Sequence, residues 1–218
     1  MKTKIVKISP NIVAIDKIEE IVKVLRKDGV MVYPTETFYG LGANGFSAAA
    51  IQKVYRLKKR EPSKPLSVVI SDLSMLFQIT SDVPLFFRQA VSKFWPGPLT
   101  LILKASPAVP DELLGLGGTI GVRLTGHKWV RSLVRQAHFP ITATSANISG
   151  EMAISHPKKA RELFEGLVDL IVDGGATRGL LPSTVVDLTG KAPRLIREGA
   201  IPSARIKKYL PALLDSSS

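Results

Sequence analysis

The sequence predicts an α/β fold: a single domain with a twisted, mixed β-sheet flanked by helices. Two patterns carry this prediction. Short apolar runs alternate with amphipathic helical segments over the first half of the 218 residues, and such runs crowd together over the second half. No repeat, low-complexity linker or break in composition divides the chain. We therefore expect one domain over residues 1–210 and a disordered tail over residues 211–218.

Nine short runs have the length and apolar content of a strand, and turn residues separate them from their neighbours. The first two are separated by a helical segment, and the second is followed by a glycine-rich loop that extends to Gly45. In chain order, the expected strands are residues 4–8, 30–33, 66–70, 99–104, 119–123, 141–144, 170–173, 184–187 and 194–197.

Helices are expected where apolar residues recur every three to four positions. Asp28-Gly29 closes the first helix, and Ser47 is expected to cap the second. Pro62 and Pro65 prevent the second helix from continuing. The expected helical segments are residues 15–25, the segment from Ser47 to Tyr55, a segment starting at Ser71, residues 84–94, 129–137 and 158–164, and a last helix starting near Ser203.

The composition narrows the classes of partner. The formal net charge is +12, which favours a polyanionic partner: nucleic acid, a nucleotide or an acidic membrane surface. No apolar run is long enough to span a membrane, and of these partners we expect nucleic acid or a nucleotide rather than a membrane. The absence of cysteine fits a reducing compartment such as the cytoplasm, and the three histidines lack the spacing of metal ligands.

A basic turn follows the second helix. It carries Lys58, Lys59, Arg60 and Lys64, and two prolines stiffen it. Cations held rigidly beside a buried strand suit an anionic ligand such as a nucleotide phosphate. The alternative is a solvated helix C-terminus, where the helix dipole favours Lys and Arg.

The segment Gly40–Gly45 matches G-x-G-x-x-G, the fingerprint of dinucleotide-binding proteins. In that motif the glycines follow the strand directly and open the helix. Here six residues separate Tyr33 from Gly40, and the helix starts only after Gly45. We therefore favour a structural role for these glycines, which permit a tight loop against the sheet.

Polar and cationic side chains recur at the ends of expected strands, where α/β sheets place ligands. Each could be ordinary turn chemistry alone, but together they predict one electropositive pocket for a phosphorylated ligand and a carboxylate-bearing ligand. No nucleophilic triad or close pair of carboxylates is evident, so we expect catalysis by positioning and electrostatics. The residues concerned are Thr35, Thr37, Arg123, Ser145, Asn147, Ser183, Thr184 and Arg197.

Five motifs in a fixed order carry a resemblance to a known family. The chain resembles the YrdC-like family, the threonylcarbamoyl-adenylate (threonylcarbamoyl-AMP) synthases, over roughly residues 10–205. Its length corresponds to the short, single-domain form. The motifs are Pro34-Thr35-Glu36-Thr37-Phe38-Tyr39-Gly40-Leu41-Gly42, Lys58-Lys59-Arg60 with Lys64-Pro65-Leu66, Phe94-Trp95-Pro96-Gly97-Pro98-Leu99-Thr100, Ala143-Thr144-Ser145-Ala146-Asn147 and Ser183-Thr184-Val185-Val186-Asp187.

The resemblance implies a twisted α/β fold around a large basic cavity. It also implies a reaction in which L-threonine, bicarbonate and ATP give threonylcarbamoyl-AMP and pyrophosphate, for threonylcarbamoyladenosine modification of tRNA next to the anticodon. A downstream threonylcarbamoyl-transfer machinery would use the product. Mg2+ would arrive on the nucleotide phosphates, without a protein metal site.

The resemblance also implies roles for individual residues. The catalytic signature falls on Lys58, Arg60, Ser145 and Asn147, which would bind the ATP phosphates, with Thr119 and Arg197 on the nucleotide side. The threonine-binding residues would be Thr35, Lys64, Arg123 and Ser183, with Arg123 on the carboxylate.

Two positions depart from the family pattern. Thr125 stands where the family often has proline, and Phe38 replaces a frequent valine, which affects local shape.

Two alternative functions stay open. One alternative is a module that binds double-stranded RNA or tRNA through the basic cavity, although the chain has few aromatic residues for stacking. The other is a carbamoyl-transfer domain of the kind found inside hydrogenase-maturation proteins.

Overall fold

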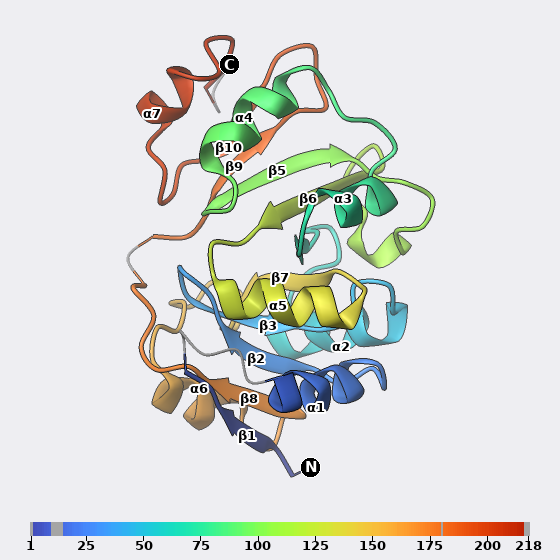
Figure 1. The fold of residues 1–218 in the computed structure, drawn as a ribbon, viewed down its shortest axis with the longest axis vertical. Coiled ribbons are helices and arrows are strands. Elements are labelled where there is room, and N and C mark those ends of the chain that lie inside the picture. The colour runs from blue at the N-terminus through green and yellow to red at the C-terminus, as the bar shows by residue number, and fades with distance from the viewer. Residues whose placement is uncertain (1, 10–14, 180, 216–218) are drawn as a thin grey trace.

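The computed structural model describes residues 2–9, 15–179 and 181–215, and within them ten strands form one continuous sheet (Figure 1). The strands are β1 (Lys4–Lys7), β2 (Met31–Pro34), β3 (Tyr39–Gly42), β4 (Ser67–Ile70), β5 (Leu99–Lys104), β6 (Thr119–Leu124), β7 (Ile141–Ser145), β8 (Leu170–Asp173), β9 (Thr184–Asp187) and β10 (Arg194–Arg197).

The strand order is β1-β8-β2-β3-β7-β4-β6-β5-β9-β10, with β1 and β10 at the two edges. The pairs β1/β8, β2/β8, β4/β6 and β5/β9 are parallel, and the other neighbours are antiparallel. Strands that are distant in the sequence therefore lie side by side, as β3 and β7 do. The mixed sheet predicted from the sequence is confirmed.

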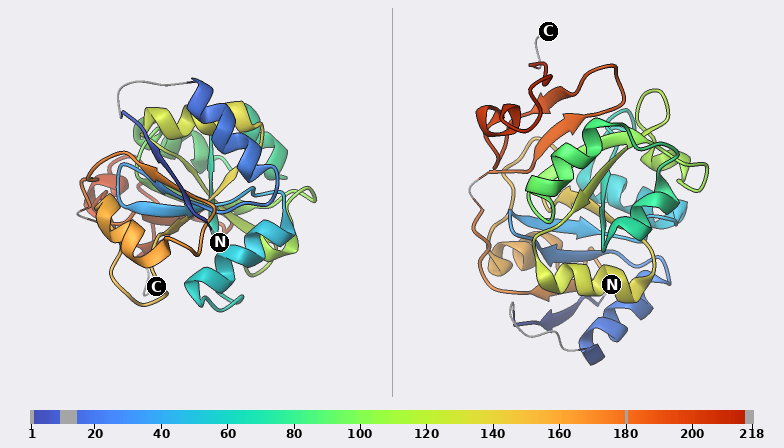
Figure 2. Two further views of the ribbon diagram at one scale, coloured as in Figure 1. Left: turned by 90° about the horizontal axis from the view of Figure 1, so that it is seen from below. Right: turned by 45° about the horizontal axis from the view of Figure 1, so that its top comes forward.

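Helices cover both faces of this sheet. They are α1 (Ile15–Leu25), α2 (Ala48–Lys58), α3 (Leu73–Ile79), α4 (Phe86–Phe94), α5 (Lys128–Ala137), α6 (Pro157–Phe164) and α7 (Ser203–Lys207), with a 3-10 turn, η1 (Asp111–Leu113). Figure 2 shows α1 and α5 on one face and α2 and α6 on the other, with the strands fanned out by twist. Among the described residues, no helix combines the length and the apolar character needed to span a membrane.

The helix ends follow the local signals in the sequence. The Ser47 hydroxyl accepts a hydrogen bond from the backbone N–H of Ala50, as expected of an N-cap. Asp72 caps α3 in the same way by accepting from Met75 N–H. Helix α2 ends where Lys59 adopts the left-handed conformation, with φ of 49°, and this reversal starts the basic turn.

The expected glycine-rich loop after β2 is wrong in part, because its middle forms strand β3, which pairs with β2 as an antiparallel hairpin. Glycine has a low strand propensity, so the sequence hides this strand. A Cβ on Gly42 would lie 2.7 Å from Cε1 of Tyr33 and 2.8 Å from Cε of Met31. The glycine gives room for the buried Tyr33 ring, which supports a packing role for Gly42 rather than a dinucleotide-binding one.

The C-terminal segment differs from the expected disordered tail at residues 211–215. Leu213 is buried, and the backbone of Leu214 exchanges hydrogen bonds with Leu195 and Pro193 beside β10. The apolar contacts of Leu210 and Leu213 hold this segment against the sheet edge. Residues 216–218 lie outside the described residues.

Candidate functional site

A cavity of about 340 Å3 lies against one face of the sheet. Its floor follows the alternation of side chains along a strand. In β6, Thr119, Gly121 and Arg123 line the cavity, whereas Ile120 and Val122 between them are buried in the core. Strands β4, β5, β7 and β9 contribute lining residues as well. Pockets of about 300–1,000 Å3 accommodate small-molecule ligands.

The depth of the floor depends on Gly121. A Cβ at this position would lie 2.6 Å from Oγ of Ser67 and 3.5 Å from Cγ2 of Thr100. Both neighbours also line the cavity. The absence of a side chain at Gly121 therefore leaves space in the cavity beside Ser67 and Thr100.

Three arginines reach the cavity from separate elements. Arg60 comes from the basic turn after α2, Arg123 from the end of β6, and Arg197 from the end of β10. Burial lowers the pKa of Arg197, and repulsion from Arg123 and then Arg60 lowers it further. Arg123 and Arg60 thus both repel the Arg197 guanidinium, and an anionic ligand would relieve this repulsion.

Two of these arginines are anchored by backbone carbonyl groups. Arg60 donates from Nε to the carbonyl of Lys64 (2.7 Å) and from Nη2 to that of Pro65 (3.2 Å). Arg197 donates from Nη2 to the Ser183 carbonyl (2.9 Å). These hydrogen bonds fix the direction of each guanidinium group. The stiffness of the basic turn led us to expect this for Arg60.

Lys58 lies behind the cavity rather than in its wall. Its side chain is 1% exposed, and Nζ donates to the Ser145 carbonyl (2.6 Å), the Asn147 carbonyl (3.0 Å) and Oδ1 of Asn147 (2.8 Å). An ammonium group has three donors, so these contacts use its full capacity. Burial, and secondarily repulsion from Arg60, lowers the pKa of Lys58 to about 8.

The segment that Lys58 holds presents Ser145 to the cavity. Ser145 Oγ donates to Oδ1 of Asn147 (2.6 Å), and the Asn147 amide donates to the carbonyl of Glu151 (2.6 Å). Ser145 lines the cavity, whereas Asn147 is buried beneath it. Lys58 and Asn147 therefore form a support that fixes the position of the Ser145 hydroxyl.

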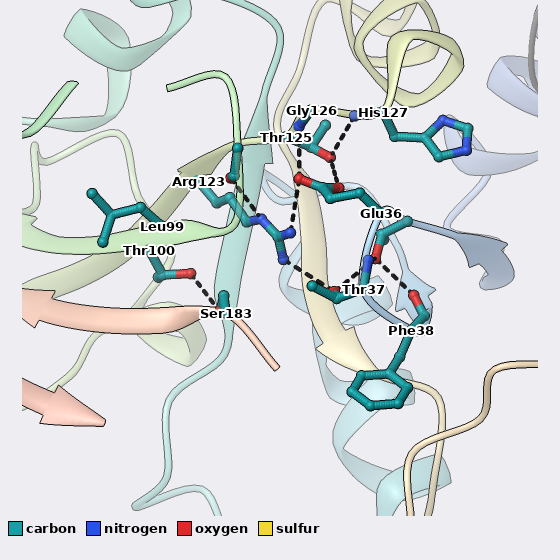
Figure 3. A network of polar contacts seen from close by, with 12 residues as sticks. Glu36, Thr37, Phe38, Leu99, Thr100, Arg123, Thr125, Gly126, His127 and Ser183 are labelled. Carbon is teal, nitrogen blue, oxygen red and sulfur yellow. Dashed lines mark hydrogen bonds and ion pairs between the residues drawn. The ribbon is translucent and has the colours of Figure 1, made fainter. Parts of the chain in front are cut away.

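Arg123 is held by a polar network that the sequence did not reveal (Figure 3). Its Nη2 forms an ion pair with Oε1 of Glu36 at 2.8 Å, and its Nε donates to the carbonyl of Gly97 at 3.2 Å. The second oxygen of Glu36 accepts from the Thr125 hydroxyl, and Oε1 accepts from Gly126 N–H at 2.7 Å. Burial alone would raise the pKa of Glu36, but Arg123 and these hydrogen bonds lower it below its usual value.

Two hydroxyl groups of the β2–β3 hairpin turn face the cavity beside this network. The Oγ1 atoms of Thr35 and Thr37 are 3.0 Å apart, and Nη1 of Arg123 donates to Thr37 Oγ1 at 3.4 Å. Thr35 also donates to the Phe38 carbonyl at 2.7 Å. The turn thus presents two hydroxyls on its cavity side, and Glu36 between them turns toward Arg123 and Gly126.

The structure brings seven of the ten predicted site residues to the cavity wall: Thr35, Arg60, Thr119, Arg123, Ser145, Ser183 and Arg197. Lys58 and Asn147 lie behind the wall. Lys64 is on the surface, where its side chain is 64% exposed and pairs with Glu61 at 3.2 Å. Sequence reasoning gave no site role to Glu36 or Thr100, although both stand in the quoted motifs. The Thr100 hydroxyl lies 3.0 Å from that of Ser183. An acidic residue at a strand end of a basic chain was the available signal for Glu36.

Comparison with known proteins gives two curated relatives with the same name. The chain is 37% identical over 186 residues to the threonylcarbamoyl-AMP synthase of Pyrococcus abyssi, covering 85% of this chain and 55% of the relative. It is 36% identical over 196 residues to the threonylcarbamoyl-AMP synthase of Bacillus subtilis, covering 89% and 56%. The chain thus spans about half the length of these two relatives.

A solved structure and a family model agree with these matches. The crystal structure of P. abyssi Sua5 complexed with L-threonine has a TM-score of 0.93 and 34% identity, covering 98% of this chain and 62% of that chain. The family model Sua5_yciO_yrdC, described as "Telomere recombination", matches residues 23–199. The chain therefore belongs to the Sua5/YciO/YrdC family.

Proposed function

We propose that this chain is a threonylcarbamoyl-AMP synthase. The observation that carries the proposal is the convergence of Arg60, Arg123 and Arg197 on one cavity. Two substrates of the proposed reaction are anionic at separate groups, the ATP triphosphate and the threonine carboxylate. The names of the two curated relatives and the threonine bound to P. abyssi Sua5 support the synthase over the RNA-binding alternative.

The proposed reaction joins three substrates. The amino group of L-threonine and bicarbonate give a carbamate and water. A carbamate oxygen then attacks the α-phosphorus of ATP, and pyrophosphate leaves with the electron pair of the broken P–O bond. The product is threonylcarbamoyl-AMP. The chain would contribute by placing the carbamate in line with the leaving group and by balancing negative charge on the phosphates.

We assign the nucleotide phosphates to Arg60 and Ser145, with Thr119 and Arg197 on the same side. Arg60 is anchored by two carbonyl groups, so its guanidinium reaches the phosphates without reorganisation. Lys58 and Asn147 hold the segment of Ser145 in place, and the Ser145 hydroxyl would turn its proton from Oδ1 of Asn147 to a phosphate oxygen when ATP binds. This assigns the catalytic signature to two groups in the cavity and two groups that support them.

We assign threonine to the wall formed by Arg123, Thr35 and Ser183. A planar guanidinium matches a carboxylate bidentately. Among the described residues, the contacts of Arg123 with Gly97 and Thr37 use Nε and one N–H of Nη1, and Nη2 is buried beside Glu36 without a hydrogen bond. The exposed Lys64 would reach the ligand only by leaving Glu61.

Bicarbonate and Mg2+ complete the proposed set of small molecules. The described residues hold no group of three or more His, Cys, Asp or Glu side chains suited to a metal ion. These residues do not form a protein cage for Mg2+, so we propose that the ion enters on the ATP phosphates, and no step is assigned to it.

We further propose that the product serves threonylcarbamoyladenosine modification of tRNA in the cytoplasm, through a separate transfer machinery. A mixed acyl–phosphate anhydride such as threonylcarbamoyl-AMP is an activated acyl donor. The next reaction must therefore be an acyl transfer to a nucleophile, with AMP as the leaving group.

Incubation of the chain with 13C-bicarbonate, L-threonine and ATP tests the proposal. We expect a product with the mass of threonylcarbamoyl-AMP that carries the 13C label, formed only when all three substrates are present. A folded chain that forms no labelled product, and whose tRNA binding weakens steeply with salt, would instead support the RNA-binding alternative.

A further inference from the structure

We propose that Glu36 is a positioning residue for threonine recognition: it fixes the guanidinium of Arg123 in the orientation that receives the threonine carboxylate. This inference rests on the proposed function and deepens it. Glu36 is not part of the cavity wall, so its effect on the ligand is transmitted through Arg123.

The contacts of Glu36 join two turns that are far apart in the sequence. Its Oε1 meets Nη2 of Arg123 at 2.8 Å and accepts from Gly126 N–H at 2.7 Å, while Oε2 accepts from the Thr125 hydroxyl. Thr125 in turn accepts from His127 N–H at 3.2 Å and is fully buried. Both oxygens of the carboxylate are therefore held by hydrogen bonds that do not involve Arg123 (Figure 3).

Arg123 is constrained along its length as well as at its tip. Its Nε donates to the Gly97 carbonyl, Nη2 faces Glu36, and Nη1 points toward Thr37. The side chain is nearly buried, at 9% exposed. A guanidinium held on three sides loses little freedom when it binds a carboxylate, and this preorganisation lowers the cost of binding.

The sign of the effect separates positioning from simple electrostatics. Glu36 is anionic at neutral pH because Arg123 and its hydrogen bonds outweigh burial and lower its pKa. By Coulomb's law alone, removal of this negative charge would strengthen the attraction of Arg123 for a carboxylate. If Glu36 positions Arg123, its removal weakens threonine binding instead.

The test is calorimetric binding of L-threonine without ATP, in the unaltered chain and in Glu36→Gln, with folding checked by circular dichroism. We expect Glu36→Gln to weaken threonine binding by about 10- to 100-fold, as for a misplacement of about 1 Å. ATP binding should stay unchanged. Glu162→Gln is the matched control, because Glu162 forms a surface ion pair with Lys159 at 3.2 Å.

A double-mutant cycle asks whether Glu36 acts through Arg123. Arg123→Lys keeps the cation but loses the fork, so threonine binding weakens. We expect the double variant Glu36→Gln/Arg123→Lys to bind threonine no more weakly than Arg123→Lys alone. Additive losses would overturn the inference, since they would mean that Glu36 acts independently of Arg123.

A second pair of variants leaves both charges in place. Thr125→Val removes the hydroxyl that donates to Glu36, whereas Thr125→Ser keeps it. We expect Thr125→Val to bind threonine more weakly than Thr125→Ser. Equal affinities of Thr125→Val and Thr125→Ser would overturn the inference but not the proposed function. The same holds if Glu36→Gln binds threonine as tightly as the unaltered chain or more tightly. Absence of threonine binding in the unaltered chain would overturn the proposed function and the inference with it.

Discussion

The ammonium of Lys58 donates two hydrogen bonds to Asn147, one to the side-chain Oδ1 at 2.8 Å and one to the backbone carbonyl at 3.0 Å. The sequence predicts both residues as members of the catalytic signature, and they meet behind the cavity wall rather than in it. The third hydrogen bond of Lys58, to the Ser145 carbonyl, completes the support. Lys58 thus supports the site from behind the cavity wall, whereas Ser145 is part of the wall.

Lys58→Met should destabilise the fold as well as stop the reaction. The substitution leaves the buried Asn147 carbonyl without a donor, and it removes one of two donors from the Ser145 carbonyl and from Oδ1 of Asn147. An unsatisfied buried acceptor costs about 1–3 kcal/mol. We expect the free energy of unfolding in urea to fall by about 2 kcal/mol or more. The exposed neighbour Lys59 provides the control, Lys59→Met. Lost activity with wild-type stability would instead indicate a direct phosphate contact by Lys58.

Arg60→Gln should slow turnover without weakening threonine. Its guanidinium is preorganised toward the cavity, and loss of one preorganised donor costs about 100- to 1,000-fold in kcat. Steady-state pyrophosphate release at saturating substrates measures this loss, and calorimetry measures threonine affinity. Arg56→Gln, on the exposed side of helix α2, which precedes the turn of Arg60, is the matched control. Normal turnover in Arg60→Gln would remove this arginine from the phosphate site.

Gly42→Ala should destabilise the fold, because its Cβ would lie 2.7 Å from Tyr33 and 2.8 Å from Met31. Overpacking of a core usually costs about 1–3 kcal/mol. Gly190→Ala is the control, since its Cβ would meet its nearest neighbour at an ordinary 3.5 Å. Equal free energies of unfolding for the two variants would contradict the packing role.

The ion pair of Glu36 predicts a loss of stability in acid. Its pKa in the folded chain lies below the ordinary value of 4.5, chiefly through Arg123 once the opposing effect of burial is overcome. The stability contributed by the ionised carboxyl is complete above the unfolded pKa and is lost as the pH falls through the folded pKa. The gap in unfolding free energy between the unaltered chain and Glu36→Gln should therefore narrow as the pH falls below the ordinary value of 4.5. A gap that stays constant as the solution is acidified would contradict the assignment.

Much of the fold could be predicted from local patterns. The strands β8, β9 and β10 begin and end at the expected residues, because short apolar runs between turns define them well. Strand β3 was missed because Gly40 and Gly42 remove the side chains from which strands are recognised. The strand order was also beyond local patterns, since it depends on contacts between distant segments.

The sequence predicts most residues of the cavity wall, but it does not predict that Lys58 and Asn147 support the wall from behind. Arg60, Arg123 and Arg197 stand at the ends of elements, where ligand groups are expected. The burial of Lys58 had no local signal, because its partner Asn147 is 89 residues away. The same holds for Glu36 and Thr125, which are also 89 residues apart. Residues that hold other residues in place are identified only from the folded arrangement.

The most direct test of the proposed function is pyrophosphate release from ATP, with threonine and bicarbonate each omitted in turn. We expect release that requires both compounds, because the attacking oxygen belongs to a carbamate built from the two. Release that is indifferent to threonine, or no release from a folded chain, would contradict the assignment of the cavity to threonylcarbamoyl-AMP synthesis.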